Sequence, residues 1–153
     1  MSQESIDTLT TVLEHARSER DAALHAMQLA ERAAAAAQEQ ASQLQAYRVE
    51  YHQRWTGRFR QAGSVELLQC YQGFSGRLDQ AISLQTDSVK HAQARLDRAR
   101  ALLLTRETRV AAVGKLIERR QNELRLATDR REQRQTDETA ARISAARNTT
   151  PLG

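Results

Sequence analysis

Residues 33–41 read AAAAAQEQA, in a chain of 153 residues with six glycines and a single proline, Pro151. Alanine has the highest helix propensity of all residues, whereas a flexible linker would be rich in Gly, Ser or Pro. We therefore interpret this run as part of a helix. Hydrophobic residues make up 40% of the chain but aromatic residues only 4%, which is too little bulk for an ordinary two-layer globular core.

The alanine run belongs to a long heptad pattern, in which apolar residues recur at alternating spacings of four and three. This spacing places them on one stripe of a helix, as in a coiled coil. The first stripe consists of Leu9, Leu13, Ala16, Arg20, Ala23, Met27, Ala30, Ala34, Ala37, Ala41, Leu44, Arg48, Tyr51 and Trp55. The second consists of Tyr71, Ser75, Leu78, Ile82, Gln85, Val89, Ala92, Leu96, Ala99, Leu103, Arg106, Val110, Val113, Ile117, Arg120, Leu124 and Ala127.

A turn is predicted between the two stripes. Gly57 and Gly63 bracket RFRQA, and Ser64 followed by Val65 and Glu66 is typical of a helix N-cap with an acid in the first turn. Folding the chain there lays the stripes antiparallel. Small residues of the first stripe then face large residues of the second, so the alanines let the helices approach closely.

The sequence therefore predicts an all-α fold, a long antiparallel two-helix coiled-coil hairpin with a C-terminal helical overhang. We expect one domain over 1–153, with helix 1 at about 6–56, a turn at about 57–64, helix 2 at about 65–147 and a disordered tail at 148–153. Helix 1 should begin opposite Val113. Residues 115–147, with nine Lys or Arg and six acids, should then project as a single helix that either frays or inserts into a partner.

Nearly all aromatic residues lie in YRVEYHQRW at 47–55 and CYQGFSGRL at 70–78. One interpretation is that these rings pack at the tip of the hairpin and that Gly73 and Gly76 make room for them. The tip set consists of Tyr47, Tyr51, Trp55 and Tyr71. The other interpretation is that Phe74 lies off the core stripe and forms, with nearby residues, a partly exposed apolar face for a partner. That face consists of Phe74, Leu78, Ala81 and Gln85.

The residues that usually carry chemistry are sparse and scattered. The four histidines share no i,i+4 pair, no Gly-rich phosphate loop is present, and the single cysteine, Cys70, is read as a small buried side chain. Two helices offer no concave pocket for carboxylates to converge on. We therefore predict no enzyme activity, no cofactor and no metal.

The N-terminal MSQESIDTLT lacks the features of a signal peptide, and no apolar stretch approaches the roughly 20 residues of a membrane span. We predict a cytoplasmic protein without direct membrane insertion. Residues 1–56 carry five Arg and eight acids (−3), and 57–153 carry eighteen Lys or Arg and eleven acids (+7). This basic excess raises the alternative of a nucleic-acid-binding or scaffold coiled coil, but acids interrupt the arginines in RREQRQTDE at 130–138. No nucleic-acid partner is expected.

Two segments resemble a known family. YxxEY at 47–51 and YQxFxxxLxxAI at 71–82, followed by a long Arg- and Gln-rich helix, are similar to the flagellar export protein FliJ family. The resemblance implies a component of the flagellar type III export apparatus that serves motility, built like the gamma stalk of rotary ATP synthases. It also implies a peripheral position at the cytoplasmic face of the inner membrane. A virulence type III secretion stalk is the alternative within the same class.

The resemblance also implies partners. The end of the hairpin that carries the chain termini would insert into the ring of the flagellum-specific export ATPase, through Lys115, Arg119, Arg120, Arg125, Arg130, Arg131 and Arg134. The cytoplasmic domain of the large export-gate membrane protein would bind Phe74, Leu78, Ala81 and Gln85, the last at a position where relatives can show a histidine. Export chaperones would be escorted, without assigned residues.

Overall fold

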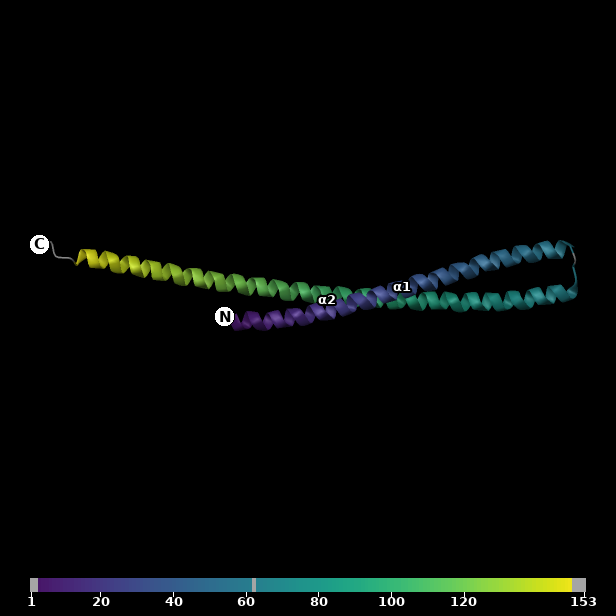
Figure 1. The fold of residues 1–153 in the computed structure, drawn as a ribbon, viewed down its shortest axis with the longest axis horizontal. Helices are drawn as coiled ribbons and strands as arrows, with labels where there is room; N and C mark the ends of the chain where they lie inside the picture. The colour runs from purple at the N-terminus through teal and green to yellow at the C-terminus, as the bar shows by residue number, and fades with distance from the viewer. Residues whose placement is uncertain (1–2, 62, 150–153) are drawn as a thin grey trace. The chain divides into compact units, whose positions relative to one another are not determined.

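The computed structural model describes residues 3–61 and 63–149, which form two helices. Helix α1 runs from Gln3–Gln61 and α2 from Val65–Asn148, and together they account for all regular secondary structure of these residues. The helices run antiparallel and pack against each other (Figure 1), so the predicted all-α hairpin is confirmed. Within the described ranges, neither helix holds a stretch that is long and apolar enough to cross a membrane.

The first helix is longer than the sequence pattern predicts. It begins at Gln3 and continues through Gly57 to Gln61, so the predicted turn at 57–64 is wrong for residues 57–61. Aromatic packing explains the extension, because the ring of Phe59 lies 5.5 Å from that of Trp55 and 5.9 Å from that of Tyr71. Two arginines in the last turn also interact favourably with the helix dipole.

The start of α2 agrees with its predicted N-cap. The Ser64 Oγ accepts a hydrogen bond from the backbone N–H of Leu67 at 3.1 Å, and the Ser64 carbonyl accepts one from Leu68 at 3.2 Å. The other end of α2 differs slightly from the prediction. Asn148 is helical and the N–H of Thr149 donates to the Ala145 carbonyl at 3.1 Å, so the disordered tail does not begin at 148. Its remaining residues, 150–153, lie outside the described part of the chain.

The chain divides into two compact units, each with its own small interior. One unit comprises residues 20–105, and its buried apolar residues are Ala23, Leu78 and Leu96. The other comprises the remaining described residues, 3–19 and 106–149, and buries Ile6, Ala16 and Ile117. Five of these six lie on the predicted stripes, and only Ile6 precedes them. The heptad pattern therefore identified the interior correctly.

The alanine seam, which we define as Ala30, Ala34, Ala37 and Ala41, faces α2 as predicted. All four alanines are half-buried, and so are the α2 stripe residues across from them, Ile82, Gln85, Val89 and Ala92. None of these eight residues is fully buried. Methyl groups therefore line α1 where it faces α2, and the facing positions along the seam are half-buried on both helices.

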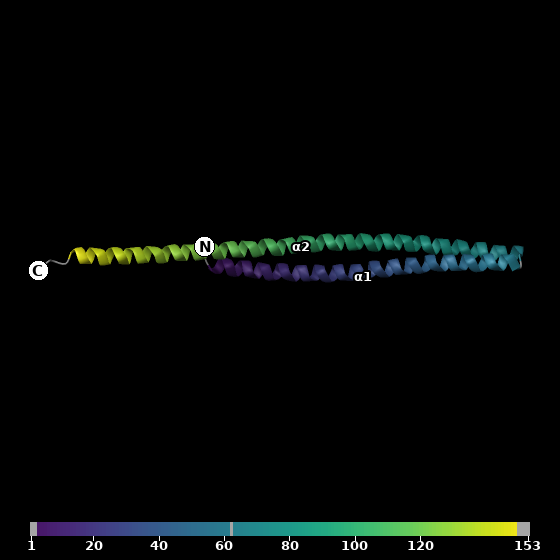
Figure 2. The same cartoon turned by 90° about the horizontal axis from the view of Figure 1, so that it is seen from above.

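In the unit 3–19 and 106–149, the start of α1 lies farther along α2 than predicted. Ile6 lines a groove together with Leu124 and with other residues at 121–129, so α1 does not begin opposite Val113. Ile6 adds one position before Leu9 to the stripe of α1, and Leu124 already belongs to the stripe of α2. The predicted overhang from residue 115 is therefore wrong in its starting point. The part of α2 without a neighbouring helix (Figures 1 and 2) follows the groove at 121–129 and so begins near residue 130. Residues 125–149 are exposed throughout.

Charged residues reinforce the packing in this unit. Glu19 Oε2 accepts hydrogen bonds from Arg106 Nη1 at 2.9 Å and Arg109 Nη1 at 3.2 Å, and His15 Nε2 lies 3.0 Å from Glu19 Oε1. Arg106 interrupts the apolar stripe of α2. Without Glu19, its half-buried guanidinium group would be poorly solvated and would lack this carboxylate partner. The interruption is thus matched by a carboxylate on the facing helix.

We predict that Leu96→Ala lowers the free energy of unfolding by about 2–5 kcal/mol, because this side chain is only 4% exposed and its truncation leaves a cavity. Leu84→Ala is the matched control on the same helix, since Leu84 is 63% exposed, and it should change stability by less than about 0.5 kcal/mol. Urea unfolding followed by circular dichroism measures both. Equal effects of the two substitutions would contradict the proposed interior.

Candidate docking surface beside the turn

Six aromatic rings cluster in the unit 20–105, next to the turn. Tyr51 is central, with ring centroids 4.4 Å from Phe74, 5.9 Å from Tyr71, 5.9 Å from Trp55 and 6.1 Å from Tyr47. Phe59 completes the set through Trp55 and Tyr71. These separations and tilted or stacked geometries are those of favourable aromatic pairs. The four residues predicted to pack at the tip, Tyr47, Tyr51, Trp55 and Tyr71, all belong to this cluster.

Phe74 belongs to this cluster, although the heptad pattern placed it outside the core. Its ring contacts Tyr51 and meets Tyr47 edge-on at 6.3 Å, and the residue is half-buried. The ring is therefore part of the packing at the tip and remains partly exposed. The physical reason is the size of the ring: a position beside the stripe can still reach across the interface when the facing residue is a tyrosine. Phe59 was also missed, because the predicted turn began at residue 57 and therefore included Phe59.

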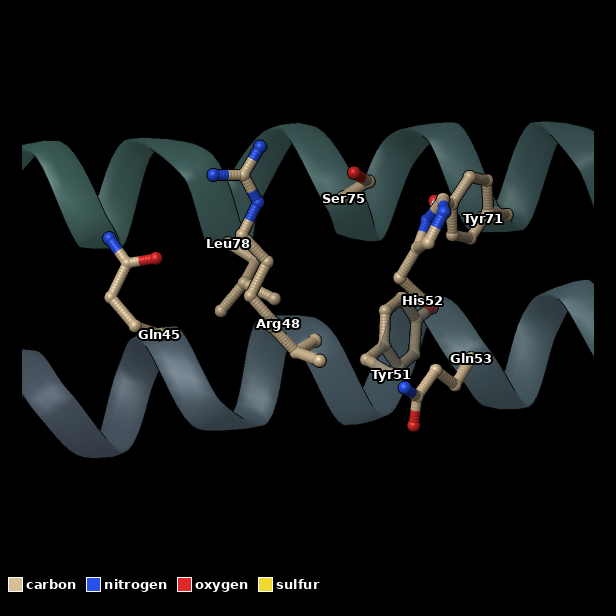
Figure 3. Close-up of a pocket in the computed structure, with 9 residues that line it drawn as sticks. Gln45, Arg48, Tyr51, His52, Gln53, Tyr71, Ser75 and Leu78 are labelled. Atoms are coloured by element: carbon tan, nitrogen blue, oxygen red, sulfur yellow. The ribbon is translucent and has the colours of Figure 1, made fainter.

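On one side of the helix interface, a groove with a cavity of about 480 Å³ lies between α1 and α2 (Figure 3). Arg48 extends from α1 and its Nε lies 3.2 Å from Asp79 Oδ1 on α2, while His52 Nδ1 and the Tyr71 hydroxyl are hydrogen bonded at 2.5 Å. The groove is lined by Gln45, Arg48, Val49, Tyr51, His52, Gln53, Tyr71, Ser75 and Leu78. Most of its lining residues are polar, and the contacts of Arg48 with Asp79 and of His52 with Tyr71 join the two helices beside it.

The four residues that the resemblance assigns to the export gate all turn toward α1. Leu78 is buried, and Phe74, Ala81 and Gln85 are half-buried. Gln85 Nε2 donates to the Ala37 carbonyl at 2.9 Å and to Gln40 Oε1 at 3.3 Å, and the residue shares a shallow groove with four residues of α1. These α1 residues are Gln40, Gln43, Leu44 and Tyr47. The set is therefore part of the helix interface, and only its edges are open to a partner.

Gly73 and Gly76 do not make room for the aromatic rings. A Cβ placed at either position meets no atom within 4 Å, so both glycines lie in open space. The interpretation that they accommodate rings is therefore wrong. Cys70 is also exposed rather than buried. The outer surface of α2 beside the turn thus carries unusually small side chains, although glycine inside a helix is unfavourable.

The seven basic residues predicted to enter an ATPase ring fall into two groups, both in the unit 3–19 and 106–149. Lys115, Arg119 and Arg120 precede the groove at 121–129, so they lie where α2 still runs beside α1. Arg120 is half-buried and its Nη1 lies 3.6 Å from Glu123 Oε2. Arg125 lines the groove with Ile6. Of the seven, Arg130, Arg131 and Arg134 lie on the part of α2 without a neighbouring helix.

Among the residues that the structure describes, no three His, Cys, Asp or Glu side chains are grouped so that they could hold a metal ion. The grooves between the helices are shallow and open. We therefore consider these surfaces for their ability to contact other proteins.

Comparison with known proteins gives one match. The family model of the Flagellar FliJ protein matches residues 5–149, which is nearly the whole chain. No curated protein and no solved structure matches the chain.

We predict that Phe74→Ala lowers the free energy of unfolding by about 2–3 kcal/mol, somewhat less than the truncation of a fully buried aromatic, because the ring is half-buried against Tyr51. Val49→Ala serves as a control, since Val49 is an exposed apolar residue of α1. Thermal and urea unfolding measure both variants. A Phe74→Ala protein as stable as the control would show that the ring contributes no packing energy.

We also predict that Gly73→Ala and Gly76→Ala each raise the free energy of unfolding by about 0.5–1 kcal/mol. The added methyl group meets open space, and alanine has less backbone entropy to lose than glycine. Urea unfolding of the single and double variants tests this, with Gln80→Ala as a control on the same exposed helix. A loss of stability in either glycine variant would contradict the open geometry.

Proposed function

Because this chain belongs to the flagellar FliJ family, whose members are structural components of the flagellar type III export apparatus, we propose that it acts there as a non-enzymatic stalk. The stalk links the export ATPase ring to the membrane export gate and escorts export chaperones. It works in the cytoplasm at the inner face of the inner membrane and binds no nucleic acid. The matching family is flagellar, which favours this system over a virulence secretion stalk.

The observation that carries the proposal is the unequal length of the two helices. Helix α2 has 84 residues and α1 has 59, and the side chains of α2 from residue 125 to 149 are exposed. A single helix that cannot bury a face by itself is marginally stable alone and gains most from a partner. We propose that the segment from residue 130 onward enters the ATPase ring, with Arg130, Arg131 and Arg134 as its leading cations.

The earlier part of the predicted ring-binding set has a different proposed role. Lys115, Arg119 and Arg120 lie on the two-helix part of the unit, and Arg125 lies beside the start of α1. We propose that these residues contact the rim of the ring, where the paired helices would meet it. We propose the same kind of contact for both groups, in which the cations approach acidic side chains of a partner with an attraction that salt weakens.

For the export gate, we propose the surface around Phe74, Leu78, Ala81 and Gln85. Apolar and aromatic side chains of this kind are common anchors of protein interfaces. Since these side chains also hold α1 and α2 together, their truncation disturbs the fold and binding at once. Loss of gate binding in such variants therefore needs a stability measurement beside it.

We predict that deletion of residues 130–153 leaves a folded hairpin and abolishes stimulation of the purified export ATPase. The buried residues Ile6, Ala16 and Ile117 all remain in the shortened chain, so its melting temperature should change little. ATPase activity with increasing amounts of each protein measures the effect.

The matched control is a full-length variant with Arg130→Gln, Arg131→Gln and Arg134→Gln, which keeps the helix and removes three charges. We expect it to stimulate the ATPase less than the natural chain, with a larger deficit at low salt than at high salt, because salt screens the attraction that the variant has lost. A shortened chain that stimulates the ATPase fully would rule out the insertion of this segment.

A further inference from the structure

Gln85 lies on α2 across from the alanine seam, in the unit 20–105. It interrupts the apolar stripe of α2 between two buried leucines, Leu78 and Leu96. No residue of the seam or of the α2 positions across from it is fully buried. Apolar packing therefore contributes less here than on either side, and a polar contact carries relatively more weight.

The seam makes the backbone of α1 accessible to this side chain. In a helix, the side chain at position i+4 lies over the turn that contains residue i, so Ala41 lies over the carbonyl of Ala37. A methyl group leaves that carbonyl uncovered, and a carbonyl oxygen with one helical hydrogen bond can still accept a second. Gln85 Nε2 donates to it at 2.9 Å. A leucine at position 41 would cover the same atom.

The amide nitrogen of Gln85 has two hydrogens, and α1 provides an acceptor for each. The first acceptor is the Ala37 carbonyl and the second is Gln40 Oε1, at 3.3 Å. The donor side of Gln85 is therefore occupied by α1 and is not presented to a partner. Because the residue is half-buried, these bonds are partly shielded from competing water.

We infer that Gln85 is an interhelical clamp, a positioning residue that holds α1 and α2 at the close spacing of the alanine seam. It acts on the gate-binding surface through α1, because the spacing of the helices determines how Phe74 and Ala81 are presented. The inference rests on the proposed gate-binding function for its effect on a partner. Its effect on the free protein is independent of that function.

Two substitutions of Gln85 distinguish a role in holding α1 and α2 together from direct contact of this residue with the export gate. Gln85→Glu is nearly isosteric but has no amide donors, and its carboxylate faces the carbonyl oxygen of Ala37. Gln85→Lys alters the surface just as strongly, yet its ammonium group can donate to both acceptors on α1. Gln80→Glu is the matched control, since Gln80 is an exposed glutamine on the same helix.

The first measurement is hydrogen exchange of the free full-length protein in the peptides that cover residues 30–44. We expect Gln85→Glu to increase exchange there about fivefold to tenfold, the loss expected for a hydrogen bond that is partly buried. Gln85→Lys and Gln80→Glu should stay within about twofold of the natural chain. Unchanged exchange in Gln85→Glu would overturn the clamp.

The second measurement is the affinity of the same four proteins for the purified cytoplasmic domain of the export gate. We expect Gln85→Glu to bind about tenfold more weakly, Gln85→Lys to recover most of this loss, and Gln80→Glu to bind like the natural chain, in parallel with exchange. If both substitutions abolish binding while exchange is unchanged, the gate reads Gln85 directly, and the clamp is wrong while the proposed function stands. If the natural chain fails to bind the gate domain but Gln85→Glu still speeds exchange, the gate-binding function is wrong and the clamp stands.

Discussion

A helix with one narrow apolar stripe can bury that stripe only against another stripe, and this constraint governs the whole protein. Each helix is polar on its remaining surface, so neither gains a packed face without the other. Buried residues are accordingly few in the part of the chain that the structure describes, and all six lie at the interface of α1 and α2. Stability therefore comes from many half-buried contacts along the length of the interface. Where apolar packing is locally incomplete, another kind of contact has to hold the helices together.

Three kinds of contact hold the helices together at such places: aromatic packing, hydrogen bonds and ion pairs. Beside the turn, six aromatic rings pack across the interface and around Tyr51. At the alanine seam, Gln85 donates hydrogen bonds to α1, including one to the backbone. In the unit 3–19 and 106–149, Glu19 pairs with Arg106 and Arg109. Each solution involves a residue that interrupts or flanks the heptad stripe, so the irregular positions of the pattern are the informative ones.

The same constraint separates the structural from the functional parts of the chain. Where the stripes of the two helices face each other, their residues pack or hydrogen bond across the interface and stabilise the fold, as Leu78 and Gln85 do. Where α2 continues past the start of α1, its side chains do not face a second helix and are exposed. A partner can therefore use the single-helix segment without disturbing the hairpin, whereas a partner at the gate-binding surface meets residues that also hold the helices together.

The sequence by itself determined the two helices, their antiparallel pairing and five of the six buried residues, because alternating spacings of four and three define a stripe without any knowledge of the fold. It also determined the cap at Ser64, since capping is a local interaction. Tertiary structure alone decided the end of α1 at Gln61, the half-buried position of Phe74 and the start of the unpaired segment near residue 130. These features depend on the reach of individual side chains across the interface, and spacing along one helix carries no information about what a long side chain meets on the other.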